Sequence, residues 1–342
     1  MSGGDSGIQV NVAVASTKTM VADSGNSLTD PWLVVQTSSS TIICSIIPSG
    51  KIDIRERGAP PFSLRVVSSL EALRAQTEDA ALDSIRRFTS FAFAGHDRGE
   101  GLAVDGTGML GTWSIRVPTI GQRWKPASLR SLGRAGGVAS EHASPQYRED
   151  WRVCTGGIEG IYLVYNADQL FTCDTETGNT RLLYSATLHP RLAAKAPILS
   201  VVADDSRTVN PMFFICTLAE VICFDARNPD RPKLAWAHGR GPDPSLSLSL
   251  IPQLDFSCAV VSSSYSRLLS AYTAKFFSNN VFAPYEPFEI RPALLPGTLQ
   301  KCAPLWVSLF ELDDDWATEK QCSYSVFALS STGALALSGL QN

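Results

Sequence analysis

The sequence has few of the patterns that mark a catalytic or metal-binding protein. Only four of its 342 residues are histidine, and no two histidines lie at metal-ligand spacing. The nucleophile elbow Gly-x-Ser-x-Gly and the phosphate loop Gly-x-x-x-x-Gly-Lys-Ser/Thr are both absent. Gly106, Gly108 and Gly111 match Gly-x-Gly-x-x-Gly, but no helical pattern follows them, so they indicate a hairpin turn. We therefore expect no cofactor and no enzymatic activity.

The sequence also lacks Cys-x-x-Cys pairs, a secretory signal and long apolar runs. Most of its eight cysteines lie inside short apolar runs, which predicts reduced, buried thiols. The N-terminus has neither the basic nor the apolar region of a signal peptide. No apolar run reaches the ~18 residues that a membrane-spanning helix needs. We expect an intracellular, soluble protein with no membrane partner.

The sequence has fewer basic than acidic residues, 29 against 33, and a formal net charge of −4. This balance argues against a surface that binds polyanions in general. The exception is the segment 118–143, in which four basic residues precede the first acid. These residues, Arg123, Lys125, Arg130 and Arg134, are candidate contacts to phosphate backbone or to an acidic partner. The alternative is a solvated, irregular loop, because its glycines interrupt any regular pattern.

What the sequence does contain is a repeated strand–turn–strand layout, clearest in the segment 220–240. A short apolar strand ends at Phe224-Asp225, a turn rich in proline, asparagine and aspartate follows, and a second strand carries Trp236. Phe224-Asp225 stands where a WD repeat has Trp-Asp, and Ala237-His238 stands where it has Gly-His. This layout is typical of the outer half of a propeller blade.

A second copy of the layout lies upstream. Asp174 ends a strand, residues 175–179 form a polar turn, a strand returns, and His189 follows. Asp174 and Asp225 are 51 residues apart (225 − 174), close to the blade period of propellers, about 40–50 residues. We expect the aspartates and histidines to hold their blades together through hydrogen bonds, as structural residues.

Short strands between turns predict an all-β fold, an irregular WD-repeat-like β-propeller of five to seven blades. We expect a poorly ordered segment at 1–30 and the propeller at 31–342. Apolar residues recur at helical spacing near Ser68, which predicts a helical insertion at 68–90 that either faces its own core or docks a partner. The segment 118–143 is expected to be an irregular loop.

The run at residues 216–250 is more specific. It resembles the WD-repeat subunit of the RNA polymerase I core factor, the fungal counterpart of one component of the animal selectivity factor. The resemblance rests on Glu220-Val221, Asp225-Ala226-Arg227-Asn228-Pro229, Leu234, Trp236, His238 and Asp243-Pro244-Ser245-Leu246.

The resemblance implies a nuclear and nucleolar, non-enzymatic protein. Its partners would be a factor-IIB-like subunit, a helical-repeat subunit, TATA-binding protein and RNA polymerase I, with the ribosomal DNA promoter engaged through the complex. The family also has a long helical region after the propeller, which this sequence does not include. No catalytic residue is implied.

Two other functions stay open on the sequence alone. An unrelated WD-repeat scaffold would bind peptides or partner loops and act as an isolated domain. A propeller enzyme would need carboxylates or a metal ion at the central channel. The inner strands, such as residues 197–202, are mostly apolar or serine-bearing, which disfavours the enzyme.

Overall fold

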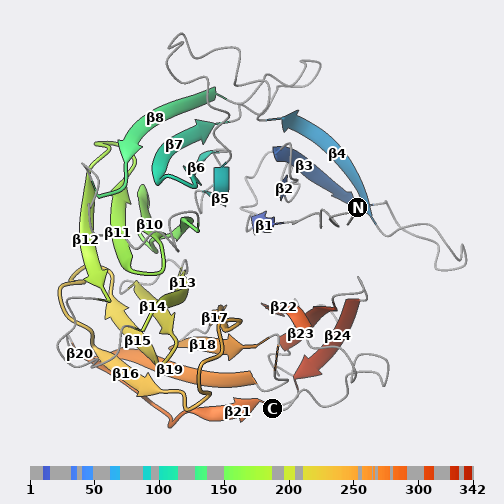
Figure 1. Ribbon diagram of the computed structural model, residues 1–342. Helices are drawn as coiled ribbons and strands as arrows, with labels where there is room; N and C mark the ends of the chain where they lie inside the picture. The colour runs from blue at the N-terminus through green and yellow to red at the C-terminus, as the bar shows by residue number, and fades with distance from the viewer. Residues whose placement is uncertain are drawn as a thin grey trace, which may run out of the picture. The chain divides into compact units, whose positions relative to one another are not determined.

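The computed structural model shows an all-β protein in the part of the chain that it describes (Figure 1). The structure describes residues 11–15, 32–36, 41–48, 62–69, 88–93, 100–114, 128–136, 150–186, 196–204, 211–252, 256–263, 265, 269–277, 280–290, 304–311, 324–330 and 335–340. Within these ranges there is no helix long and apolar enough to cross a bilayer.

The strands of these ranges form six sheets, and strands adjacent in sequence are neighbours in each sheet except at the end of the fifth, where β20 and β21 both pair with β19. The first sheet contains β1 (Asn11–Ala15), β2 (Trp32–Gln36), β3 (Thr41–Pro48) and β4 (Phe62–Ser69). The second contains β5 (Phe88–Phe93), β6 (Glu100–Asp105), β7 (Met109–Ser114) and β8 (Ser128–Arg134). The third contains β9 (Arg152–Thr155), β10 (Ile161–Tyr165), β11 (Gln169–Asp174) and β12 (Thr180–Ser185).

The remaining three sheets follow in the same manner. The fourth contains β13 (Ile198–Ala203), β14 (Met212–Thr217), β15 (Glu220–Asp225) and β16 (Leu234–Ala237). The fifth contains β17 (Ser247–Pro252), β18 (Ser257–Ser262), β19 (Leu269–Phe277), β20 (Asn280–Phe282) and β21 (Phe288–Ile290). The sixth contains β22 (Pro304–Glu311), β23 (Tyr324–Ser330) and β24 (Leu335–Leu340).

The chain divides into two compact units, where the sequence predicts one propeller over 31–342. Unit 1 comprises Met1–Thr155 with Cys173–Thr180, and unit 2 comprises Gly156–Thr172 with Arg181–Asn342. The fourth and fifth sheets both belong to unit 2, and the candidate site described below lies mainly on them.

The fourth sheet shows why these sequences form strands. Every residue of β14 is buried, and β15 is buried from its second residue onward, as expected for central strands covered on both faces. The two strands are antiparallel, with Phe214 opposite Cys223 and Ile215 opposite Ile222. The outer strand β16 instead alternates between half-buried and exposed residues, the pattern of a strand with one covered face.

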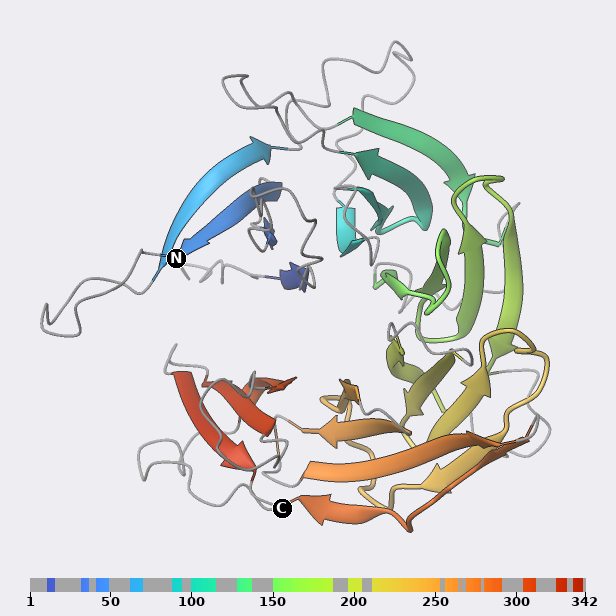
Figure 2. The same cartoon turned by 180° about the vertical axis from the view of Figure 1, so that it is seen from behind.

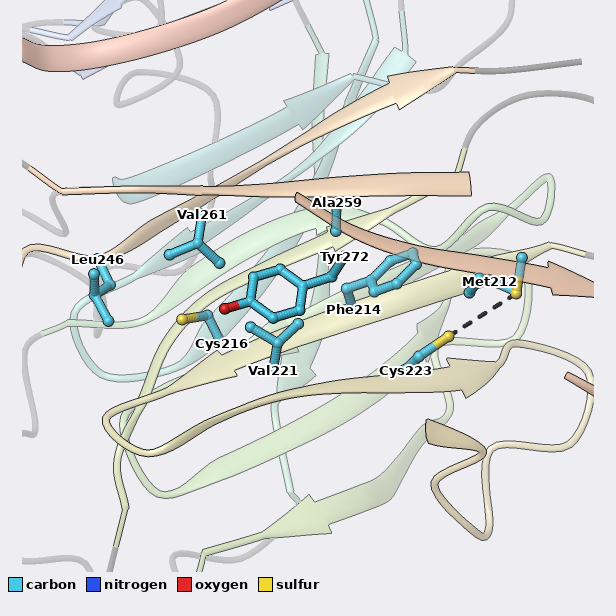
Figure 3. Packing of buried hydrophobic residues seen from close by; sticks show 10 residues of the cluster. Met212, Phe214, Cys216, Val221, Cys223, Leu246, Ala259, Val261 and Tyr272 are labelled. Atoms are coloured by element: carbon cyan, nitrogen blue, oxygen red, sulfur yellow. Dashed lines mark hydrogen bonds between the residues drawn. The ribbon is translucent and has the colours of Figure 1, made fainter. Parts of the chain in front are cut away.

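A buried cluster packs the fourth and fifth sheets of unit 2 against each other (Figure 3). Phe214 and Val221 contribute from the fourth sheet, and Val261 and Tyr272 contribute from the fifth. Trp236 packs on the cluster from β16, and its ring centroid lies 5.8 Å from that of Tyr272. Aromatic pairs at this separation add to the stabilisation that burial provides.

The cysteines of the described residues behave as small apolar side chains. None of the five whose side chains the structure describes forms a disulfide, and four of them, Cys173, Cys216, Cys223 and Cys258, are buried. Burial raises the pKa of the Cys173, Cys216 and Cys258 thiols to about 12, so these thiols are protonated near neutral pH. In Figure 3 the Cys223 sulfur points at the Met212 sulfur, 3.9 Å away.

The structure differs from the sequence-based prediction within the segment 1–30 and at both ends of the segment 68–90. Residues 11–15 belong to the segment expected to be poorly ordered, yet they form β1, because they complete a main-chain ladder with β2 in which Val12 lies opposite Val35. The predicted helix 68–90 begins and ends in strands, since Ser68 pairs with Ile43 in β3 and residues 88–90 lie in β5. Pairing between strands overrides a local helical period here. Residues 70–87 lie outside the described residues.

One segment expected to be irregular also contains a strand. Within the basic segment 118–143, β8 pairs with β7, and the register shift next to Gly111 accommodates the extra residue Leu132. Gly133 has a φ of 102°, a conformation that glycine adopts without steric cost.

Candidate functional site

Asp174 closes the turn between β11 and β12. Its carboxylate accepts hydrogen bonds from the main-chain N–H groups of Glu176, at 2.8 Å, and Thr177, at 3.3 Å. A hydrogen bond from the Thr177 side chain, together with these main-chain bonds, lowers the pKa of Asp174 below its ordinary value. Gly178, with a φ of 74°, completes the turn by donating to the Asp174 carbonyl at 2.8 Å. Asp174 therefore stabilises a turn.

Asp225 stands at the equivalent place between β15 and β16 but has a different partner. The Arg227 guanidinium donates to both carboxylate oxygens at 3.2 Å, and the Arg227 main-chain N–H donates at 3.0 Å. The same guanidinium lies over the Phe276 ring, 4.6 Å from its centroid. The Phe276 ring and the Asp225 carboxylate thus both bind the Arg227 guanidinium, the ring through cation–π attraction and the carboxylate through charge-assisted hydrogen bonds.

His238 bridges two turns of the fourth sheet. Its Nε2 donates to the carbonyl oxygen of Thr217 at 3.0 Å, and its Nδ1 accepts from the Arg240 main-chain N–H at 3.2 Å. This pair of contacts corresponds to the neutral tautomer with the proton on Nε2. Thr217 is fully buried at the end of β14, so the imidazole satisfies a buried carbonyl.

A polar cluster follows His238 on the connection into β17. Asp243 is buried and accepts hydrogen bonds from the Ser245 main-chain N–H at 2.9 Å, the Ser245 hydroxyl at 2.6 Å and the Ser263 hydroxyl. Burial raises the pKa of Asp243, but the hydrogen bonds from Ser245 and Ser263 outweigh it, and the pKa lies below the ordinary value. Arg240 reaches the Ser270 hydroxyl on β19 at 2.6 Å. This connection is therefore tied to the fifth sheet through side chains.

A further set of turn residues was not predicted from the sequence. In the second to fifth sheets, one short polar residue lies at or directly after the end of the second strand. Asp105, Asn166 and Thr217 each accept main-chain N–H bonds of 2.8–3.2 Å from the turn that follows. Ser263 accepts one at 3.0 Å from Tyr265. The available signal was a short polar residue directly after an apolar strand, which is a known turn-forming pattern.

Two of the four basic candidates, Arg130 and Arg134, lie on β8 and contact turns. The exposed Arg130 donates to the Thr175 carbonyl at 2.6 Å, and the exposed Arg134 donates to the Thr107 carbonyl at 2.8 Å. Each arginine therefore has a main-chain partner. Arg123, Lys125 and His189 lie outside the described residues.

The described residues contain no group of three or more histidine, cysteine, aspartate or glutamate side chains that would hold a metal ion. What the structure brings together instead is Trp236, His238 and the Asp243 cluster, where the fourth and fifth sheets meet. Asp225 lies at the other end of β15 from the Thr217 turn, and Asp174 lies on the third sheet. These side chains order turns and strand connections.

No protein-family model matches the sequence, and no curated protein matches it. Among solved structures, the chain is similar to one in the crystal structure of the S. cerevisiae core factor, with a TM-score of 0.55 and 14% sequence identity. The two chains share a fold. The match covers 91% of this chain and 44% of that chain, so this chain spans less than half the length of its structural neighbour.

Proposed function

We propose that this chain is a non-enzymatic subunit of an RNA polymerase I core promoter factor, and that it scaffolds assembly of the initiation complex at ribosomal DNA. The observation that carries this proposal is the fold similarity to a core-factor chain over 91% of the sequence. It agrees with the resemblance that the residues of 216–250 carry independently.

The proposed architecture is a WD-repeat-like β-propeller in which the sheets are successive blades. Three features support it. The first four strands of each sheet, or all three in the sixth, are neighbours in chain order. The fourth sheet packs on the fifth, and His238 donates to the Thr217 carbonyl within its own sheet. Four-stranded blades of this kind build propellers.

The proposed partners are the factor-IIB-like subunit and the helical-repeat subunit, and through them TATA-binding protein, RNA polymerase I and the ribosomal DNA promoter. The proposed location is the nucleus and nucleolus. Obligate subunit interfaces bury about 2,000 Å² or more and are rich in apolar residues. Unit 2 carries four exposed aromatic side chains between residues 277 and 288, which is consistent with a subunit of this kind.

Co-expression of the full chain with the factor-IIB-like and helical-repeat subunits of its own organism tests the proposal. We expect the three proteins to elute together in size-exclusion chromatography at stoichiometric ratio. The control replaces the chain by an unrelated WD-repeat propeller. Separate elution of this chain and the other two subunits would count against the proposal.

A direct DNA contact is a separate part of the proposal and concerns Arg123, Lys125, Arg130 and Arg134. Neutralising all four to glutamine should leave the fold intact, because the two described arginines are exposed and each makes a hydrogen bond worth about 0.5–1.5 kcal/mol. If these residues contact phosphates, the slope of log binding constant against log salt should become shallower by up to about 3.5.

The measurement is promoter-DNA binding by the assembled complex between 50 and 200 mM salt, a range over which about six to ten phosphate contacts change affinity strongly. The matched control neutralises the exposed Arg231 and the half-buried Lys233 of unit 2. An unchanged slope in the fourfold variant would remove the DNA role from this segment.

A WD-repeat interaction scaffold unrelated to transcription is the second candidate. The exposed aromatic side chains of unit 2 favour it as well, since they suit any protein partner. The co-expression experiment separates the two candidates, because such a scaffold would not assemble with core-factor subunits.

A further inference from the structure

Exposed aromatic side chains gather along one edge of the fifth sheet. Phe277, Phe282, Tyr285 and Phe288 are 67%, 40%, 57% and 47% exposed. Soluble proteins seldom expose so many large apolar groups within one short segment unless they contact a partner. We name Phe277, Phe282, Tyr285, Glu286, Phe288 and Glu289 the aromatic edge strip.

The fold holds this strip against the outer edge of β19 (Figure 2). At one end, β20 pairs with β19 so that Phe282 lies opposite Lys275. In the middle, the Thr273 hydroxyl donates to the Tyr285 carbonyl at 3.2 Å. At the other end, β21 pairs with β19 so that Phe288 lies opposite Ala271. Three separate attachments therefore fix the strip, so little ordering entropy would oppose binding.

Neighbouring rings orient the aromatic side chains without covering them. Phe277 and Phe282 meet edge to face, with centroids 6.4 Å apart. Tyr285 meets Phe256 in the same way at 5.8 Å. These contacts restrain the ring positions, while the four side chains of the strip stay 40–67% exposed.

The strip is acidic as well as aromatic. Residues 276–290 contain two acids, Glu286 and Glu289, and no lysine or arginine, while the half-buried Lys275 lies at the other end of the strip, opposite Phe282. Both glutamates are exposed, and both lie within three residues of an exposed ring. Carboxylates beside aromatic faces attract cations, and arginine satisfies both groups at once through its planar guanidinium.

The fourth and fifth sheets together already hold one arginine in this manner. Arg227 lies 4.6 Å from the centroid of Phe276, which precedes the strip directly, while it donates to the carboxylate of Asp225. The molecule thus provides its own example of the chemistry that the strip offers to solvent.

Two prolines determine how a partner can bind. Pro284 and Pro287 have no N–H group, so this edge cannot provide a continuous ladder of main-chain donors. A partner would therefore be recognised through side chains rather than by addition of a further strand.

We propose that the aromatic edge strip is a docking site for an extended polypeptide segment of a partner protein that carries arginine side chains. The occupant follows from charge complementarity with Glu286 and Glu289 and from the Arg227 example. The proposal does not depend on the transcription role, because the strip and its charges are properties of unit 2 alone.

The test uses the full chain and a fluorescein-labelled peptide of twelve residues that alternates arginine with serine. Fluorescence anisotropy at physiological salt should show binding, at least threefold tighter than for a lysine–serine peptide. A glutamine–serine peptide should not bind. The triple variant F282S/Y285S/F288S and the double variant E286Q/E289Q should each weaken the arginine peptide at least fivefold.

The matched control is E159Q/E176Q, which removes two exposed carboxylates elsewhere and should change affinity less than twofold. Circular dichroism should give all variants the spectrum of the wild type. Equal binding by wild type and strip variants, equal weakening by the control, or no binding at all would overturn the proposal. Sedimentation that shows a dimer abolished by F282S/Y285S/F288S would also overturn it, because a second copy would then occupy the strip.

Discussion

Replacing Phe214 by alanine should strongly destabilise unit 2. Phe214 is 0% exposed at the centre of β14 and belongs to the cluster that joins the fourth and fifth sheets. Fully burying a side chain of this size contributes about 1.5–3 kcal/mol. The cavity left by a ring enclosed by two sheets adds to the loss, so we expect the free energy of unfolding to fall by about 3–5 kcal/mol.

The assay is urea unfolding followed by tryptophan fluorescence, to which Trp236, packed on the same cluster, contributes as one of seven tryptophans. The midpoint should fall while the dependence on urea stays unchanged. Phe277→Ala is the matched control: its side chain is 67% exposed, so the loss should be below about 0.5 kcal/mol. A loss of less than about 1 kcal/mol for Phe214→Ala, or equal losses for the two variants, would refute the packing of the two sheets.

Three further predictions concern the turns and connections. Folding lowers the pKa of Asp243, so its carboxylate stabilises the fold above about pH 4 and loses this effect as the pH falls through the folded pKa. In urea titrations, wild type should therefore be more stable than Asp243→Asn near neutral pH. This difference in the free energy of unfolding should shrink steadily below about pH 4. Gly108→Ala should lower the free energy of unfolding by at least about 1–2 kcal/mol in the same assay, because φ is 83° and a new Cβ would lie 2.9 Å from the Trp151 ring. The control Gly239→Ala, at a φ of 64° with no atom within 4 Å of the new Cβ, should lower it less. His238→Ala should lower the free energy of unfolding by about 1–3 kcal/mol, because it removes the donor to the buried Thr217 carbonyl. His238→Gln, which keeps an N–H donor, should recover part of this loss. Equal losses for the two variants would contradict a role for Nε2.

Much of the strand content of residues 150–282 was predictable, because buried strands and polar turns alternate there without interruption. Residues 220–225, for example, form an apolar run that ends at Asp225, and both the strand and its turn follow from local chemistry. The predicted hairpin around Gly106 and Gly108 is confirmed as β6 and β7 for the same reason.

Strands whose partners lie far away were not predictable. Val12 and Val35 are separated by a long polar segment, and only their pairing makes residues 11–15 a strand. Ser68 continues a helical pattern in sequence but pairs with Ile43 in the structure. Local periodicity carries no information about which strand will be the neighbour.

The contacts of the candidate site were partly predictable. The sequence motif singled out His238, but its bond to Thr217 and the cluster around Asp243 depend on how turns meet in space. Exposure of Phe282 and Phe288 was not predictable, because an apolar residue in a strand is usually covered and only the arrangement of strands shows which edge is open.

The most direct test of the central claim is affinity purification of the tagged gene product from nuclei of its own organism, followed by mass spectrometry. The proposed function predicts recovery of the factor-IIB-like subunit, the helical-repeat subunit and RNA polymerase I subunits, each depleted in the untagged control. Reproducible recovery of a different set of partners, without these subunits, would contradict the core-factor assignment.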